Sequence, residues 1–405
     1  MLNAILFGIL LGIISGLTPG IHNNTFAALI LAYMPILSNY FSPFELGIVI
    51  FTNAIVHSFL DIIPSALIGV PEEDTAIAVL PAHEMVLDGK GFAALSLSAF
   101  SSLFSFLISI PIFVAFLSNL NYFYGKIYSF TPYFLIFASA FVILSERAEI
   151  FEGSLAAWRK RFYAFLVFIV SGFLGFVAFK NQSLAEINLA SSIFIPLLTG
   201  LFAAPVLIVS FKTNRIPKQD LEVKIPSIYG VLPGSLSGAL VSLFPAVSSG
   251  VATVMASAAI KDRENFISAL SSANTANALL CFAVLFAVGK VRSGAASVFS
   301  KIVNNVDVQA ILFSGIFASL ASTLLVLTIG IISIRLLEKI RLDYLSFTIL
   351  AFLFFIVYSL TGIFGLAVFL SAIPIGLSTL FLKIRRISCM GCLMLPLLLR
   401  FVFNF

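Results

Sequence analysis

The chain has 405 residues, of which 60% are hydrophobic and only 10% charged, and its formal net charge is +5. Mean hydropathy is +1.12, and uncharged runs repeatedly approach the roughly 20 residues that cross a bilayer as a helix. The sequence therefore predicts an all-α, polytopic membrane protein. Basic loops beside anionic lipid explain the positive charge, so a nucleic-acid partner is not indicated.

Long apolar runs predict ten full transmembrane helices in two groups of five. The runs are 44–69, 91–118, 128–146, 162–180 and 190–211, then 264–288, 308–337, 343–361, 364–384 and 388–404. A pair of shorter arms precedes each group, 2–17 with 23–38 and 227–243 with 247–260. We interpret these arm pairs as re-entrant hairpins or broken helices. The predicted organisation is a first repeat at 1–211, a cytoplasmic linker at 212–226 and a second repeat at 227–405.

The two halves carry proline and small residues at matching positions. Placing Gly12 on Gly238 lays "GIISGLTPGIHNN" over "GALVSLFPAVSSG" and puts Pro19 on Pro245. With Gly69 on Gly289, the helix after each hairpin can be aligned in the same way. Because five spans and one hairpin make an odd number of crossings, the two halves are predicted to be inverted repeats.

Each arm pair interrupts an apolar run with polar and small residues, and these residues are the predicted substrate site. A break at membrane depth persists only where it is packed in protein or lines a wet cavity. The second arm then begins with free N–H groups and a positive dipole end, a setting suited to an anion. The alternative is a packed kink capped by Asn and Thr. The residues are Thr18, Pro19, Gly20, His22, Asn23, Asn24 and Thr25, with Pro245, Ser248, Ser249 and Gly250 in the other half.

A second set of polar residues is predicted to handle a coupling ion. Asn53, His57 and Asp61 are spaced to share one helical face, and an intramembrane carboxylate is a functional candidate by default. The matching helix of the second half carries neutral oxygens at Asn274, Thr275 and Asn277, which suit Na⁺. The competing interpretations are a structural hydrogen bond from Asp61 and ordinary polar packing between helices. No cofactor is expected beyond Na⁺ or H⁺.

Charged residues gather in a few loops. If the loops at 70–90, 146–161, 211–226, 260–264, 335–341 and 383–386 are cytoplasmic, they hold most of the Lys and Arg, and both termini face outward. The segment 69–99 predicts an inner loop with a possible short helix. Cys389 and Cys392 form a CxxC pair with no second ligand pair, so no metal site is predicted.

The order of motifs resembles the large permease subunit of the tripartite tricarboxylate transporter family. The carrying motifs are the broken helix at Pro19-Gly20, "LIGVP" ending at Pro71, "LDGKGFAALSLSA" from Leu87, and "GVLPGSLSGALVSLFPAVSSG". Two departures are Glu72-Glu73-Asp74 after the first proline, and Lys290 with Arg292 in place of a second glycine-proline loop. The resemblance implies uptake of an organic carboxylate driven by an ion gradient, with a small membrane subunit and an extracytoplasmic binding protein as partners.

Three functional classes remain open on the sequence. A secondary transporter for a small di- or tricarboxylate, in the cytoplasmic membrane of a prokaryote, explains the opposed halves, the paired breaks and Asp61 together. A translocase for a polyprenyl-phosphate lipid carrier would use the same helix ends but needs a lateral apolar groove. An intramembrane enzyme is least favoured, because no HExxH or GxSxG motif occurs.

Overall fold

A computed structural model describes residues 1–18, 23–69, 79–146, 154–185, 192–210, 216–245, 247–257, 260 and 262–403. In these residues all regular structure is helical, in agreement with the predicted all-α class. The first half contains α1 (Leu2–Leu17), α2 (Asn23–Ala32), α3 (Met34–Leu37), α4 (Pro43–Leu60), α5 (Ile62–Leu67), α6 (Val79–Leu87), α7 (Gly91–Leu144), α8 (Ser154–Lys180), η1 (Gln182–Ala185), α9 (Phe194–Leu198), η2 (Thr199–Ala203) and α10 (Ala204–Ser210).

The second half contains α11 (Ile228–Ser242), α12 (Ser249–Ser257), α13 (Arg263–Val288), α14 (Gly294–Ile302), α15 (Val308–Leu337), α16 (Leu342–Phe381), η3 (Arg386–Met390) and α17 (Gly391–Phe403). The predicted arms correspond to α1 and α2–α3 in the first half and to α11 and α12 in the second. The predicted short helix in the first polar loop corresponds to α6.

Six helices in the described part of the chain are long and apolar enough to cross a membrane. Two of them are longer than one crossing needs. α7 has 54 residues, about 80 Å at 1.5 Å per residue, and it contains the two apolar runs 91–118 and 128–146. α16 has non-helical dihedral angles at Gly362, with φ 63°, so it consists of two helices that meet there. The count of ten full spans remains a prediction.

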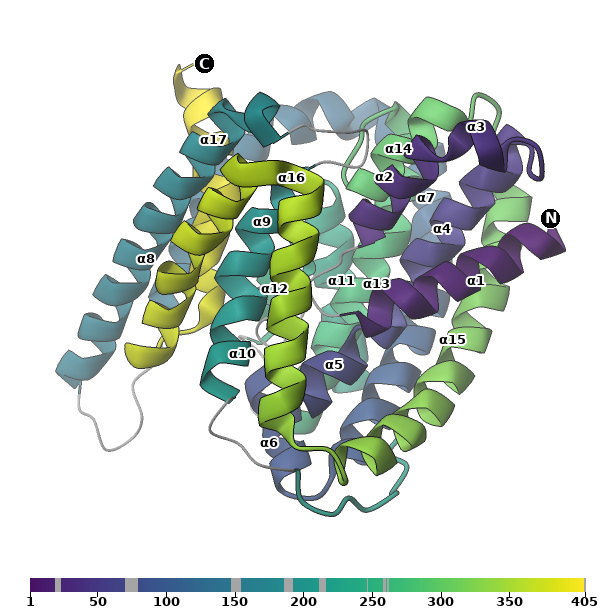
Figure 1. The fold of residues 1–405 in the computed structure, drawn as a ribbon. Helices are drawn as coiled ribbons and strands as arrows, with labels where there is room; N and C mark the ends of the chain where they lie inside the picture. The colour runs from purple at the N-terminus through teal and green to yellow at the C-terminus, as the bar shows by residue number, and fades with distance from the viewer. Residues whose placement is uncertain are drawn as a thin grey trace.

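The apolar core is divided into two main clusters. One joins α1, α4, α13, α15 and the first part of α7, with Phe51 and Phe106 among its fully buried side chains. The other joins the last part of α7 to α8, α11, α12, η3 and α17, and it includes Leu135 and Met390. Figure 1 shows α8 and α17 at one side of the molecule and α1 and α15 at the other. α7 therefore ties the two clusters together.

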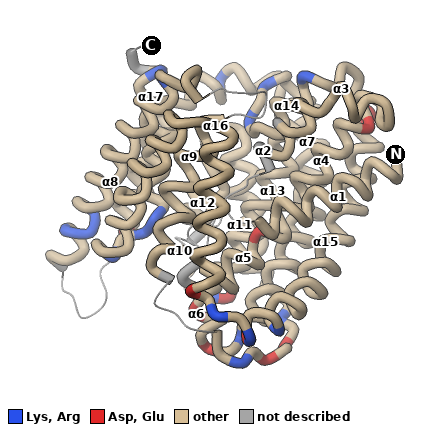
Figure 2. Tube along the Cα trace, viewed as in Figure 1, with Lys and Arg blue, Asp and Glu red and all other residues tan. Residues whose placement is uncertain are grey.

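Charged residues gather in the loops at the ends of the helices, most densely around α6 (Figure 2). Arg263 donates to Asp88 at 3.1 Å, so the loop before α13 contacts the loop after α6. The backbone N–H of Gln219 donates to Glu338 at 2.8 Å, which joins two further loops. Gln219 also donates through Nε2 to the backbone oxygen of Val86 at 2.8 Å, so four of the loops that the sequence assigns to the cytoplasm meet at one face of the protein.

The first arm packs on the following helix through small residues. Gly8, Gly12 and Gly16 form one stripe of α1 against α4. A Cβ added at Gly12 would lie 2.5 Å from the Val56 Cβ and 3.2 Å from the backbone oxygen of Asn53. Only glycine allows this separation between the two helix axes.

The first arm of the second half packs on α13 in the same way. Gly230, Gly234 and Gly238 form a stripe of α11, again spaced four residues apart. A Cβ at Gly238 would lie 2.5 Å from the backbone oxygen of Ala273 and 2.9 Å from the Ala276 Cβ. Each long core helix, α4 and α13, therefore has a glycine-faced arm lying directly on it.

Candidate functional site

The first helix break lies mostly outside the described residues. This applies to Pro19, Gly20 and His22. The next three residues, Asn23, Asn24 and Thr25, begin α2, and their side chains are likewise outside the described part. Thr18 is the described boundary of this break. Its Oγ1 donates to the backbone oxygen of Ile14 at 2.7 Å, so it satisfies the end of α1.

The second break is described except for residue 246, and it brings two predicted residues into contact with distant elements. Pro245 lies between α11 and α12, and Ser249 and Gly250 begin α12. The Ser249 hydroxyl donates to Asn274 Oδ1 at 3.3 Å. The Ser248 hydroxyl lies 4.0 Å from the sulfur of Met390. The start of α12 therefore faces both α13 and η3.

Asn53, His57 and Asp61 share one buried face at the end of α4, as predicted from their spacing. Asn53 is 0% exposed, His57 3% and Asp61 2%. The hydroxyl of Ser15 on α1 lies 3.1 Å from Asn53 Oδ1 and 3.1 Å from His57 Nδ1. α1 thus supplies a polar partner to this face two residues before its end.

The local sequence explains why α4 ends at Asp61. Pro64 has no N–H to give to the backbone oxygen of Leu60, so the regular helix is interrupted there. The backbone oxygen of Asp61 accepts from the backbone N–H of Ser65 at 3.3 Å and from its hydroxyl at 2.7 Å. The carboxyl group of Asp61 is therefore held at a helix interruption inside the protein.

The two predicted ion-coupling sets meet at this interruption. Asn274 Nδ2 donates to Asp61 Oδ2 at 2.7 Å. The same nitrogen lies 3.4 Å from the backbone oxygen of Ser58. Since Asn274 also accepts from Ser249, its amide joins the carboxylate of α4 to the beginning of α12.

The other two residues of the second set lie differently. Thr275 Oγ1 is 3.4 Å from the hydroxyl of Ser58, so it also contacts α4. Asn277 accepts from the Cys281 thiol at 3.5 Å within α13, and no hydrogen bond to the Asp61 group is described for it. Asn274 and Thr275 are therefore brought to the first set, whereas Asn277 is not.

Two polar atoms at this site have no hydrogen-bond partner in the described part of the chain. They are Asn53 Nδ2 and Thr52 Oγ1, both fully buried. A buried hydrogen-bond donor without a partner costs free energy. The amide N–H of Asn53 and the hydroxyl of Thr52 could therefore donate to a small polar molecule such as water. The surrounding groups also include hydroxyl and amide oxygens and one carboxylate. These oxygens could bind a small cation, and the carboxylate could take up a proton.

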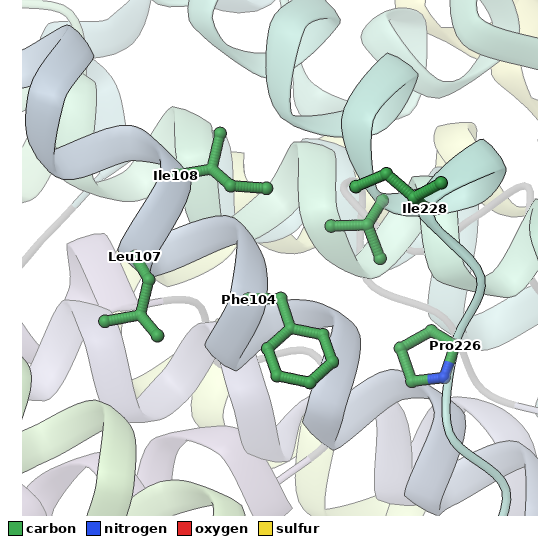
Figure 3. Close-up of a pocket in the computed structure, with 6 residues that line it drawn as sticks. Phe104, Leu107, Ile108, Pro226 and Ile228 are labelled. Carbon is green, nitrogen blue, oxygen red and sulfur yellow. The ribbon is translucent and has the colours of Figure 1, made fainter.

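A separate apolar groove lies between the first part of α7 and the start of α11. Figure 3 shows Phe104, Leu107 and Ile108 on one side, facing Pro226 and Ile228. Its volume is about 370 Å³. No charged or hydroxyl-bearing side chain lines it, so this groove cannot by itself recognise a small carboxylate.

Sequence reasoning missed two contributors to the polar site. Ser15 and Ser58 each carry a hydroxyl that could have been noticed, but single serines are common in membrane helices and give no distinct signal. Their importance follows from contacts with residues 42 and 217 positions away in the chain. Only the fold shows these contacts.

Comparison with known proteins identifies related sequences. The family model of the tripartite tricarboxylate transporter TctA family matches residues 2–391. An uncharacterized protein of Methanocaldococcus jannaschii is 29% identical over 421 aligned positions, which cover 99% of this chain and 100% of that protein. No solved structure matches.

Proposed function

The chain belongs to the tripartite tricarboxylate transporter TctA family, and from this premise we propose that it moves a small di- or tricarboxylate by ion-coupled alternating access. The family is one of transporters, so a membrane transport component is the function that membership implies. The substrate class and the ion coupling are our proposal, and the polar site supports them.

One observation carries the proposal. A buried carboxyl group of the first half, Asp61, accepts a hydrogen bond from Asn274 of the second half. Asn274 also bonds Ser249 at the start of α12. A change in the charge or ligation of Asp61 therefore acts directly on the helix start that we propose to bind the anion. This is the physical link that coupling requires between an ion site and a substrate site.

The inverted-repeat organisation is part of the proposal, and the glycine contacts support it. Gly12 contacts Val56, and Gly238 contacts Ala276. The alignment of the two halves places Gly12 on Gly238 and Val56 on Ala276, so a contact in one half corresponds to a contact in the other. Two equivalent bodies that rock about a central site provide alternating access.

We propose that the substrate binds at the N-terminal ends of α2 and α12. The N–H groups that begin each helix would face the carboxylates of the substrate. The predicted residues of the first break, from Thr18 to Thr25, and Ser248 to Gly250 of the second would line this site. Asp61, with Asn53 and His57, would bind the driving ion, H⁺ or Na⁺.

We further propose that the chain works with a small membrane subunit and an extracytoplasmic solute-binding protein in the cytoplasmic membrane of a prokaryote. Family membership supports these partners. The loops that meet around α6 would face the cytoplasm, because basic residues are concentrated there.

Substitution of Asp61 by Asn tests the proposal. The variant keeps the size and hydrogen-bonding capacity of the side chain but removes its titrating charge. In proteoliposomes that contain the protein with its partner subunits, citrate or succinate uptake driven by an H⁺ or Na⁺ gradient should fail. Exchange of labelled for unlabelled substrate between two loaded sides should survive.

A matched control is Asp343→Asn. Asp343 is an acid at the start of α16 that pairs with Arg341 at 2.6 Å, outside the buried polar site. This variant should retain concentrative uptake. If D61N also retained concentrative uptake with an unchanged pH profile, Asp61 would be a structural residue, and the ion would have to bind elsewhere.

A translocase for a polyprenyl-phosphate lipid carrier is the second candidate, and the apolar groove in Figure 3 favours it. A lipid carrier needs such a lateral groove for its hydrocarbon chain. Competition separates the two functions: a polyprenyl phosphate should displace citrate from a lipid translocase and should leave a carboxylate transporter unaffected.

A further inference from the structure

The η3 turn contains a buried cation, the guanidinium of Arg386. Arg386 is 6% exposed. Its Nη1 has no hydrogen-bond partner, and no ion pair of Arg386 occurs within the described residues. A buried guanidinium is normally paired because removing its charge from water is costly. Among the described residues this guanidinium therefore has no anion beside it, and a carboxylate that binds there would supply one.

The neighbouring arginine shows what a structural arginine looks like in the same turn. Arg385 donates through Nε to Glu146 at 3.2 Å, and its backbone N–H donates to the same carboxylate at 2.9 Å. It also bonds the Ser145 hydroxyl. Arg385 thus anchors the turn after α16 to the end of α7, and no ion pair of this kind is found for Arg386 among the described residues.

The groups near Arg386 do not neutralise it. Cys389, three residues further on, is a buried free thiol and carries no carboxylate. Burial lowers the pKa of Arg386 to about 10, which leaves the guanidinium protonated. Ser388, two residues further on, has a buried hydroxyl that also lacks a partner. η3 therefore offers hydrogen-bond donors and a positive charge but no carboxylate.

The position of η3 relates this charge to the second helix break. Met390, at the other end of η3, lies 4.0 Å from Ser248, which immediately precedes α12. Four residues of a 3₁₀-helix advance about 8 Å, and an arginine side chain can extend over much of such a distance. The turn that carries this charge is thus in contact with the residue before α12.

We propose that the Arg386 guanidinium binds a carboxylate group of the transported anion beside the second helix break. This inference rests on the proposed function and names the residue that recognises the substrate's charge. Guanidinium groups suit this task because their planar donors match the two oxygens of a carboxylate. A di- or tricarboxylate could place one carboxylate on Arg386 and another on the helix start.

The test compares Arg386→Gln with Arg385→Gln in the purified full-length chain, by thermal unfolding with citrate and with succinate. Loss of a charge-assisted hydrogen bond should weaken binding by about 10- to 100-fold in R386Q. Without ligand, R386Q should melt at the wild-type temperature or higher, because an unpaired buried charge is removed. R385Q should melt at a lower temperature, because Glu146 loses its partner, but it should respond to citrate as the wild type does.

A second variant and a lipid control complete the design. Arg386→Lys keeps the charge without the planar fork, so its affinity for citrate should fall between those of the wild type and R386Q. Equal citrate affinity in R386Q and the wild type would overturn the inference. So would a wild-type protein stabilised by phosphatidylglycerol through Arg386 and not by citrate. If no carboxylate bound or was transported by the wild type, the proposed function itself would fail.

Discussion

The glycine-faced contacts of α1 and α11 make a quantitative prediction about both halves. Replacing Gly238 with Val introduces a Cβ that would lie 2.5 Å from the backbone oxygen of Ala273. An ordinary contact between these atoms needs about 0.9 Å more, and the oxygen belongs to the backbone of a packed helix, which cannot shift by itself. Overpacking of this kind costs about 1–3 kcal/mol. Gly12→Val meets Val56 at the same separation and should cost a similar amount.

The control for this experiment is Gly125→Val in α7. A Cβ at Gly125 has nothing within 4 Å, so the same substitution should change stability by less than about 0.5 kcal/mol, since valine is somewhat better than glycine in a helix. Titration with a denaturing detergent measures the free energy of unfolding of the wild type and of all three variants. Transport should fall in G12V and G238V because the shifted arms adjoin Asn53 and Ala273, beside the polar site.

Two results would refute this reasoning. If G238V unfolded at the same detergent concentration as the wild type, α11 would not lie against α13 as closely as the structure has it. If G238V were destabilised and G12V were not, the two arms would differ in their packing, and the correspondence between the halves would lose its support.

Further predictions concern the polar site and the loops. Asn274→Ala removes the 2.7 Å bond to Asp61, a charge-assisted interaction of about 1.5–3 kcal/mol, so the affinity for the driving ion should change by about 10-fold or more in binding assays. A single cysteine at position 218, in place of the exposed Lys218, should be labelled only from the cytoplasm, and one in place of Asn181 only from outside; labelling of both from one side would contradict the proposed orientation. Arg263→Gln should lower the free energy of unfolding by less than about 1 kcal/mol, because its ion pairs are half exposed. A larger decrease would contradict this estimate and show that these ion pairs stabilise the loops strongly.

Much of the secondary structure could be predicted from the sequence, because the length of an apolar run and the position of proline determine where a membrane helix can begin and end. The arms 2–17 and 227–243 coincide with α1 and α11 to within about one residue. The run 23–38 differs, since the structure divides it at Tyr33 into α2 and α3. The two runs in α7 were separated in the sequence by polar residues that the helix accommodates without a break.

The sequence could predict which residues of the candidate site share a helix face, but not which residues meet that face. The spacing of Asn53, His57 and Asp61 determines that they share a face, because helical geometry is local. Which residues meet that face is not local: Asp61 and Asn274 are 213 positions apart, and no period or motif relates them. The role proposed for Arg386 was hidden for the same reason, since beside Arg385 it reads as an ordinary basic loop residue. Burial and the ion pairs found among the described residues are properties of the packed chain, so only the tertiary structure separates these two arginines.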